Sequence, residues 1–186
     1  IWSRKLNPSW SSNWTTNCNT QFNDIGVGAS NLSELREPLE RLVREASVDG
    51  AKVAKSWYGV NGWTFHHNID LWRYAHPSDG SVLWATFPIG GAWTTVELYD
   101  LWKFSSDKKE LEELTAKKPD AGTVLLCSAP VSSTIIIRQS LLDVIEAGET
   151  LGIKNDPIIK QARETLAKMP KLEIGPDGEI RQWNRD

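Results

Sequence analysis

Helical periodicity is the feature that most constrains the fold of this chain. Apolar side chains recur three or four residues apart, most clearly over residues 132–151, where Ile137, Leu141 and Ile145 form one stripe. The same spacing predicts helices over 31–46, 91–104 and 107–118, and from Asn155 to Pro170. Only the tail differs, because residues 171–183 are predicted to form a β-hairpin. We therefore expect a mainly α protein with long loops and a C-terminal β-hairpin.

The segments between these stretches divide the chain. We expect an irregular segment over residues 1–29, helices over 31–57, a long site loop over 59–90 and further helices over 91–169. Pro38 is predicted to kink or break the helix that starts at 31, with Ser30 or Asn31 as its cap. Asp49 is predicted to cap a second, short helix over 50–57. Repeated glycines and prolines predict a loop with short extended pieces over 59–90.

Composition excludes several classes of partner. The 21 basic and 24 acidic residues give a formal net charge of −3, so a nucleic-acid partner is not predicted. No apolar run approaches the roughly 20 residues that a membrane helix requires, so no membrane partner is predicted either. Cys18 and Cys127 are interpreted as free thiols. Glycosylation sequons at Asn13 and Asn31 lean slightly toward a secreted parent protein, and the sequence leaves the compartment open.

Residues 59–72 carry the clearest functional signal. They hold two of the three histidines and two of the ten tryptophans of the chain, together with asparagine and aspartate. Such a mixture indicates a polar cleft with aromatic walls, which suits a sugar, because a pyranose has apolar faces and a hydroxyl rim. The candidate substrate-binding residues are Trp63, His66, His67, Asn68, Asp70 and Trp72.

Each of these residues also has an ordinary structural interpretation. Most tryptophans pack in cores, and His66, His67 and Asp70 are equally consistent with a hydrogen-bond network that braces the loop. His67 and Asp70 could also be two metal ligands, but the sequence shows no third, so we predict no metal site.

The same segment carries a family resemblance. Its pattern Gly-Trp-x-x-His-His-Asn-x-Asp-x-Trp resembles the signature of glycoside hydrolase family 95, the 1,2-α-L-fucosidase family. Residues 31–39, 88–93 and 174–183 resemble further stretches of that family in the same order. The resemblance implies that residues 1–186 are part of a catalytic domain whose fold is an (α/α)6 barrel. The chain has helices for about half of such a barrel, so we expect an incomplete, barrel-like helical array.

The resemblance also implies a reaction and a partner. The family hydrolyses terminal α-L-fucosyl or related linkages with inversion and without a cofactor, so the implied partner is a fucosylated glycan. Asn17 and Asn19 match the Asn-x-Asn motif that positions the attacking water. Their alternating spacing would place both amides on one side of an extended segment, and we expect residues 59–72 to line a concave surface together with residues 13–19. The alternative is that the two amides only satisfy loop backbone.

The family's catalytic carboxylates are missing from the sequence. The Ser-Pro-Glu-Asn stretch of the general acid does not occur, and the interval between 107–118 and 132–151 looks internally deleted. The base is expected in a region beyond Asp186. The carboxylates considered as substitutes are Asp70, Asp79, Glu97 and Asp100.

Three outcomes therefore remain open for the chain. It is expected to be an inactive segment of a glycoside hydrolase, a non-catalytic carbohydrate-binding remnant, or a helical fragment without function. In each case the unpartnered helix faces of a half barrel predict self-association through exposed apolar surface.

Overall fold

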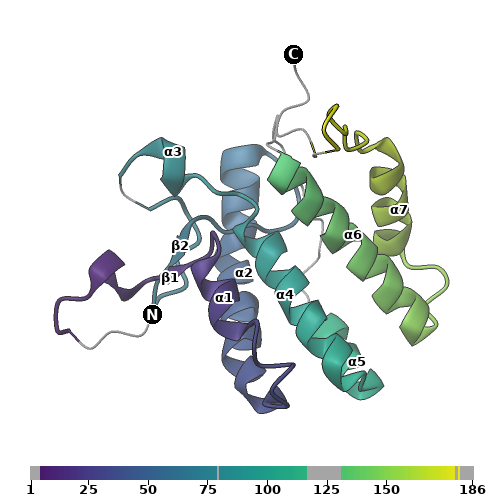
Figure 1. Cartoon of the computed structure of the whole chain (residues 1–186), viewed down its shortest axis with the longest axis horizontal. Coiled ribbons are helices and arrows are strands. Elements are labelled where there is room, and N and C mark those ends of the chain that lie inside the picture. Colours follow the sequence, from purple (N-terminus) through teal and green to yellow (C-terminus); the bar gives the residue numbers. More distant parts are fainter. Residues whose placement is uncertain (1–4, 79, 117–130, 179, 181–186) are drawn as a thin grey trace.

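The computed structural model describes residues 5–78, 80–116, 131–178 and 180, and this part of the chain is mainly helical, as the sequence predicts (Figure 1). The longer helices lie side by side in an open array, with α4 between α2 on one side and α6 on the other. No helix in the described ranges is long and apolar enough to cross a membrane. The elements in chain order are η1 (Ser9–Ser12), β1 (Trp14–Thr15), α1 (Asn19–Asp24), η2 (Ser33–Arg36), α2 (Glu37–Tyr58), β2 (Asn68–Ile69), α3 (Val82–Ala85), α4 (Gly90–Ser105), α5 (Lys108–Ala116), α6 (Val131–Leu151) and α7 (Pro157–Lys168).

The prediction of two helices over residues 31–57 is wrong, because one long helix, α2, covers most of this range. It runs unbroken for 22 residues, and Pro38 lies in its first turn, where a missing backbone N–H costs nothing. Its N-cap is Arg36 without a side-chain cap, so the predicted capping by Ser30 or Asn31 is wrong. Asp49 lies inside the helix and accepts a hydrogen bond from the backbone N–H of Ala75 at 3.1 Å. It therefore anchors the following loop instead of capping a helix.

The segment over residues 1–29 is less irregular than predicted. It contains the short helices η1 and α1 and the strand β1. The signal for α1 was weak because its six residues give less than two turns of periodicity, and its buried side chains are the polar Thr20 and Gln21. Its position depends on tertiary contacts with α4 and β1.

The helices after residue 90 follow the sequence closely. Helix α4 packs against α6, and α6 packs against α7. The predicted stripe on α6 is only partly right, because Ile145 is buried but Ile137 and Leu141 are half-buried, and Asp143 is buried on the same helix. Asp156, not Asn155, caps α7 by accepting a hydrogen bond from the backbone N–H of Ile158 at 2.7 Å. Most of the interval that looks internally deleted, with Cys127, lies outside the described residues, as does the candidate carboxylate Asp79.

The two remaining predictions concern loops. Residues 59–90 form a loop that contains β2 and the short helix α3, so the predicted extended pieces are confirmed and one helical turn was missed. In the tail, Ile174 and Ile180 form an isolated antiparallel bridge around a turn, closed by a 3.0 Å hydrogen bond from Gly178 N–H to the Gly175 carbonyl. The described residues thus show the turn of the predicted hairpin and one bridge.

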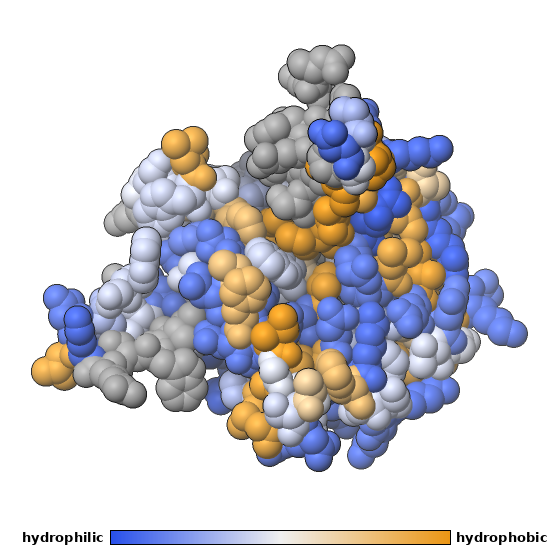
Figure 2. Space-filling model, viewed as in Figure 1, coloured by the Kyte–Doolittle hydropathy of each residue, from blue (hydrophilic) through white to orange (hydrophobic). Residues whose placement is uncertain are grey.

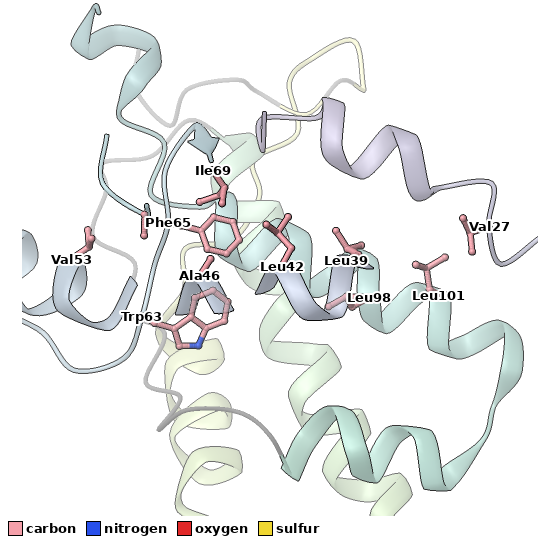
Figure 3. Close-up of a cluster of buried hydrophobic side chains, with 11 residues drawn as sticks. Val27, Leu39, Leu42, Ala46, Val53, Trp63, Phe65, Ile69, Leu98 and Leu101 are labelled. Atoms are coloured by element: carbon pink, nitrogen blue, oxygen red, sulfur yellow. The ribbon is translucent and has the colours of Figure 1, made fainter. Parts of the chain in front are cut away.

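The larger hydrophobic core lies where α2, α4 and the loop after α2 meet (Figure 3). Leu39 and Leu42 on α2 lie near Leu98 on α4, and at one end of this cluster Ala46 on α2 lies beside a group of side chains from the loop. That group consists of Trp63, Phe65 and Ile69. Because the site loop itself is anchored in the core, its polar residues are held in fixed positions.

Candidate functional site

The two segments that carry the candidate residues lie side by side. β1 pairs with β2 in antiparallel register, with Trp14 opposite Ile69 and Thr15 opposite Asn68. The contact continues beyond the strands, since the Thr16 N–H donates to the His67 carbonyl at 2.7 Å. The predicted contact of residues 13–19 with residues 59–72 is therefore confirmed, and the concave surface they were expected to line stays a prediction. We call the region formed by these two segments, residues 13–19 and 59–72, the β1–β2 junction.

Helix α1, which follows β1 in the chain, is connected to the junction by side-chain hydrogen bonds. Gln21 is buried, and its Nε2 donates to the Thr16 carbonyl at 2.9 Å and to Thr94 Oγ1 on α4 at 3.3 Å. The Thr20 hydroxyl donates to the Thr15 carbonyl at 2.9 Å. Thus α1 is connected by side-chain hydrogen bonds both to β1 and to α4, and the residues just before it cannot move independently of the core.

Asn17 and Asn19 flank the start of this helix. Asn17 is half-buried and Asn19 is exposed. Cys18 between them has φ 124°, a backbone conformation that non-glycine residues rarely adopt, and α1 begins at Asn19. The expected extended segment with both amides on one side is therefore wrong, because the chain turns at Cys18 into a helix. Both asparagines nevertheless lie directly after β1, at the β1–β2 junction.

His66 is fully buried and both of its ring nitrogens have partners. Nδ1 accepts a hydrogen bond from the Phe87 N–H at 3.0 Å, and Nε2 lies 3.2 Å from the Tyr58 hydroxyl. Since Nδ1 accepts, the proton of the neutral ring is on Nε2 and points to Tyr58 Oη. Burial, with a smaller contribution from His76, lowers the pKa of His66 to about 4. This arrangement braces the loop, in agreement with the structural interpretation of the sequence.

His67 differs from its neighbour. It is 7% exposed, and its Nδ1 is buried without a hydrogen-bond partner in the described part of the chain. Burial lowers the pKa of its ring, which favours the neutral form. The ring of Trp84 on α3 meets it edge to face, with centroids 5.2 Å apart, and Trp84 is itself 43% exposed. Sequence reasoning missed Trp84, because its 17-residue distance from His67 in the chain gives no local pattern.

Asn68 and Asp70 take part in local hydrogen bonding. The Thr15 hydroxyl donates to Asn68 Oδ1 at 3.0 Å, and Asn68 Nδ2 donates to the Ser78 hydroxyl at 3.3 Å. Asp70 Oδ1 accepts from the backbone N–H groups of Trp72 at 2.9 Å and Tyr74 at 3.0 Å. This oxygen of Asp70 therefore closes a turn, which is the usual function of aspartate in loops.

The two candidate tryptophans lie in opposite environments. Trp63 is 7% exposed and belongs to the core, where its ring lies 5.7 Å from that of Phe65 (Figure 3). Trp72 is 88% exposed, so its ring faces are open to a partner. Only Trp72 of the pair has the accessibility that stacking against a sugar requires.

Close packing explains why a glycine, Gly90, is the first residue of α4. A Cβ on Gly90 would lie 2.6 Å from Thr16 Oγ1 and 2.9 Å from the Phe65 carbonyl oxygen. A side chain at this position would push α4 away from the β1–β2 junction. The Pro-Ile-Gly-Gly-Ala-Trp stretch thus lets the backbone of α4 touch the loop that carries the histidines.

The chemistry available at the junction is that of amides and rings. Asn17 and Asn19 offer amide donors and acceptors, and Trp72 and Trp84 offer aromatic faces. In the described ranges, no group of three or more His, Cys, Asp or Glu side chains is arranged to hold a metal ion. Such a set suits the binding of a hydroxyl-rich ligand more than the transfer of protons.

Comparison with known proteins identifies the family of the chain. The model of the glycosyl hydrolase family 95 catalytic domain matches residues 1–117, more than half of the 186 residues, and the chain belongs to this family. The whole chain also aligns with Alpha-L-fucosidase 2 of Arabidopsis thaliana at 28% identity and with Probable alpha-fucosidase A of Aspergillus niger at 25% identity. It covers 26% and 28% of these proteins, so it spans about a quarter of the length of the curated relatives it matches.

Proposed function

We propose that the β1–β2 junction is part of the glycan site of an α-L-fucosidase-like glycoside hydrolase. The observation that carries this proposal is the pairing of β1 with β2, which joins the Asn-x-Asn segment to the His-His-Asn segment. Both segments lie within the residues that match the family model. The fold of the whole domain would be the (α/α)6 barrel, of which the described helices would form one part.

The roles we assign follow from exposure and partners. Asn17 and Asn19 would hold the attacking water, because their side chains lie at the surface of the junction. Trp72 would stack against an apolar sugar face, since its ring is exposed. His66 would keep the loop in place and would not touch the sugar.

We further propose that this chain alone does not hydrolyse fucosides. Inverting hydrolysis requires a carboxylic acid and a carboxylate on opposite sides of the bond, and each contributes about 10²–10⁴-fold to the rate. One oxygen of Asp70, the carboxylate nearest in sequence to the histidines, closes a turn. The alignment with the Arabidopsis relative extends over 220 residues, 34 more than this chain has, which supports an internal deletion.

Two measurements test the proposal. The chain is incubated with an aryl α-L-fucoside and with a 2-fucosylated oligosaccharide, and binding of the oligosaccharide is followed by saturation-transfer NMR. We expect saturation transfer to the fucosyl protons without release of fucose. Trp72→Ala is expected to weaken the transfer, whereas Phe104→Ala, which also removes an exposed ring, is expected to leave it unchanged. Asn19→Ala is the second test variant. Asn23→Ala is its control, since both asparagines are exposed on α1.

The outcomes separate the alternatives. Binding without hydrolysis is also what a non-catalytic carbohydrate-binding remnant would show, and the occupied oxygen of Asp70 favours that second candidate. A Ser-Pro-Glu-Asn stretch and a His-Leu-Ser-His region in the flanking genomic sequence would decide for a segment of an enzyme. Absence of binding would contradict the glycan site, and release of fucose that disappears in Asp70→Asn would contradict the inactivity.

A further inference from the structure

The turn between α1 and η2 presents an asparagine that is exposed in the described part of the chain. Asn31 is exposed and has φ 54°, so it lies in the left-handed conformation that asparagine tolerates well. Its backbone N–H donates to the Gly28 carbonyl at 3.1 Å, which closes the turn. Its side-chain amide is exposed and takes no part in this turn.

Asn31 is the first residue of an Asn-Leu-Ser sequon whose third residue is also accessible. Ser33 is exposed at the start of η2, and that helix has no side-chain cap hydrogen bond. Both groups that N-glycosylation requires, the amide of Asn31 and the hydroxyl of Ser33, are therefore exposed on the same turn.

The other sequon, which begins at Asn13, is placed in the opposite way. Asn13 is half-buried and directly precedes β1. Thr15, the third residue, is only 9% exposed, and its hydroxyl donates to Asn68 Oδ1 at 3.0 Å. A glycan on Asn13 would have to fit beside the β1–β2 junction and would compete with the pairing of the two strands.

The surroundings of Asn31 have room for a glycan and apolar surface for it to cover. The turn lies at the end of the array where α1 and α4 end, away from β1 and β2 (Figure 1). Leu32, Leu35 and Phe104 are 42%, 51% and 62% exposed, and the Phe104 ring lies against Gly28. Apolar side chains gather at this lower end in the view of Figure 2. A glycan is bulky and solubilising, so it would shield these side chains without reaching the junction.

We propose that Asn31 is an acceptor for an N-linked glycan and that Asn13 is not. In this reaction a lipid-diphosphate-linked oligosaccharide is the donor. A bond forms between Nδ2 of Asn31 and C1 of the first sugar, the bond from C1 to the diphosphate oxygen breaks, the lipid diphosphate leaves with the electron pair, and Nδ2 loses one proton. This proposal does not rest on the glycan site at the junction, because it concerns a covalent sugar at the opposite end.

The test is to express the chain with a signal peptide in eukaryotic cells and to analyse the secreted, folded protein. Peptide N-glycosidase in heavy-oxygen water converts each occupied asparagine to a labelled aspartate, which peptide mass spectrometry locates. We expect the label at Asn31 and not at Asn13. Loss of the glycan is expected in Asn31→Gln and in Ser33→Ala, whereas Asn13→Gln and Ser33→Thr should keep it.

Peptide mapping of the protein without substitutions tests the proposal even if a variant is not secreted. An unlabelled Asn31 would overturn the proposal, and so would a label at Asn13. Retention of a glycan in the double variant Asn31→Gln, Asn13→Gln would show attachment elsewhere and would also contradict it.

Discussion

Glu97 on α4 gives the sharpest test of the packing between α1 and α4. The side chain is half-buried and has no ion-pair partner among the described residues, and Asp24 at the end of α1 and Asp100 are its charged neighbours. Lys103, the nearest cation on the same helix, pairs with Asp100 at 3.1 Å and approaches Asp143 at 3.8 Å. Burial, followed by repulsion from Asp100 and Asp24, raises the pKa of Glu97 from its ordinary 4.5 to about 7.

The magnitude follows from the linkage between proton binding and folding. Below pH 4.5 Glu97 is neutral in both states, so it has no electrostatic effect on stability. Between 4.5 and about 7 the unfolded chain releases the proton first, so the free energy of unfolding falls as the pH rises. The shift from 4.5 to about 7 corresponds, without solvent screening, to about 3 kcal/mol, because one pKa unit is about 1.4 kcal/mol. Since the side chain is only half-buried and solvent screens part of this effect, we expect about 1–2 kcal/mol.

Glu97→Gln removes this titration at nearly constant shape. We expect the variant to equal the unmodified chain in stability at about pH 4.5 and to exceed it by about 1–2 kcal/mol at about pH 8. The measurement is urea unfolding followed by tryptophan fluorescence at several pH values. Glu113→Gln on α5 is the control, because it removes the same charge from an exposed position. A stability difference that does not change with pH, or an equal effect of the control, would refute the reasoning.

Three further predictions concern other parts of the structure. His66→Ala should lower the free energy of unfolding by about 2–4 kcal/mol in chemical denaturation, because it leaves a cavity and the Phe87 N–H without an acceptor. The stabilising effect of His66, measured as the difference in unfolding free energy between the unmodified chain and the variant, should shrink as the pH falls from 6.5 toward about 4, since the unfolded histidine binds its proton first; this contribution is opposite in sign to that of Glu97. Gly90→Ala should cost about 2–3 kcal/mol through its contact with Thr16 Oγ1, whereas Gly26→Ala, which meets nothing within 4 Å, should be neutral or slightly stabilising in the same assay. The chain produced in bacteria, without glycans, should self-associate in size-exclusion chromatography with light scattering, and a monomer that binds no hydrophobic dye would contradict the exposure of its apolar side chains.

Long amphipathic segments were predictable from the sequence, because many turns of the same periodicity reinforce one another. The predicted bounds of α4, 91–104, differ by one residue at each end from the observed Gly90–Ser105. Pro38 was misread because proline is equally compatible with a helix break and with a first helical turn, and only the packing of α2 decides between them. The sequence could not reveal α1 either, since its buried polar side chains depend on partners far along the chain.

At the candidate site, residue types were easier to predict than their environments. The meeting of the two segments was predicted correctly, but His66 and His67 are adjacent in sequence and have different surroundings. The His66 ring has hydrogen-bond partners on both nitrogens, whereas the His67 ring has a buried nitrogen without a partner among the described residues. The burial of Trp63 and the exposure of Trp72 are likewise set by where the loop enters the core, and no local pattern distinguishes them.

The pairing of β1 with β2 also bears on the order in which the protein assembles. Thr15 and Asn68 are 53 residues apart in the chain, and each strand contributes only two residues to the ladder. Closing a flexible loop of that length costs about 3.5 kcal/mol of chain entropy, more than so short a ladder returns by itself. We therefore expect the strands to pair after α1, α2 and α4 have brought their ends together. We expect the amide hydrogens of the junction to exchange with solvent faster than those of the α2 core, since a late-forming contact is also an early one to open.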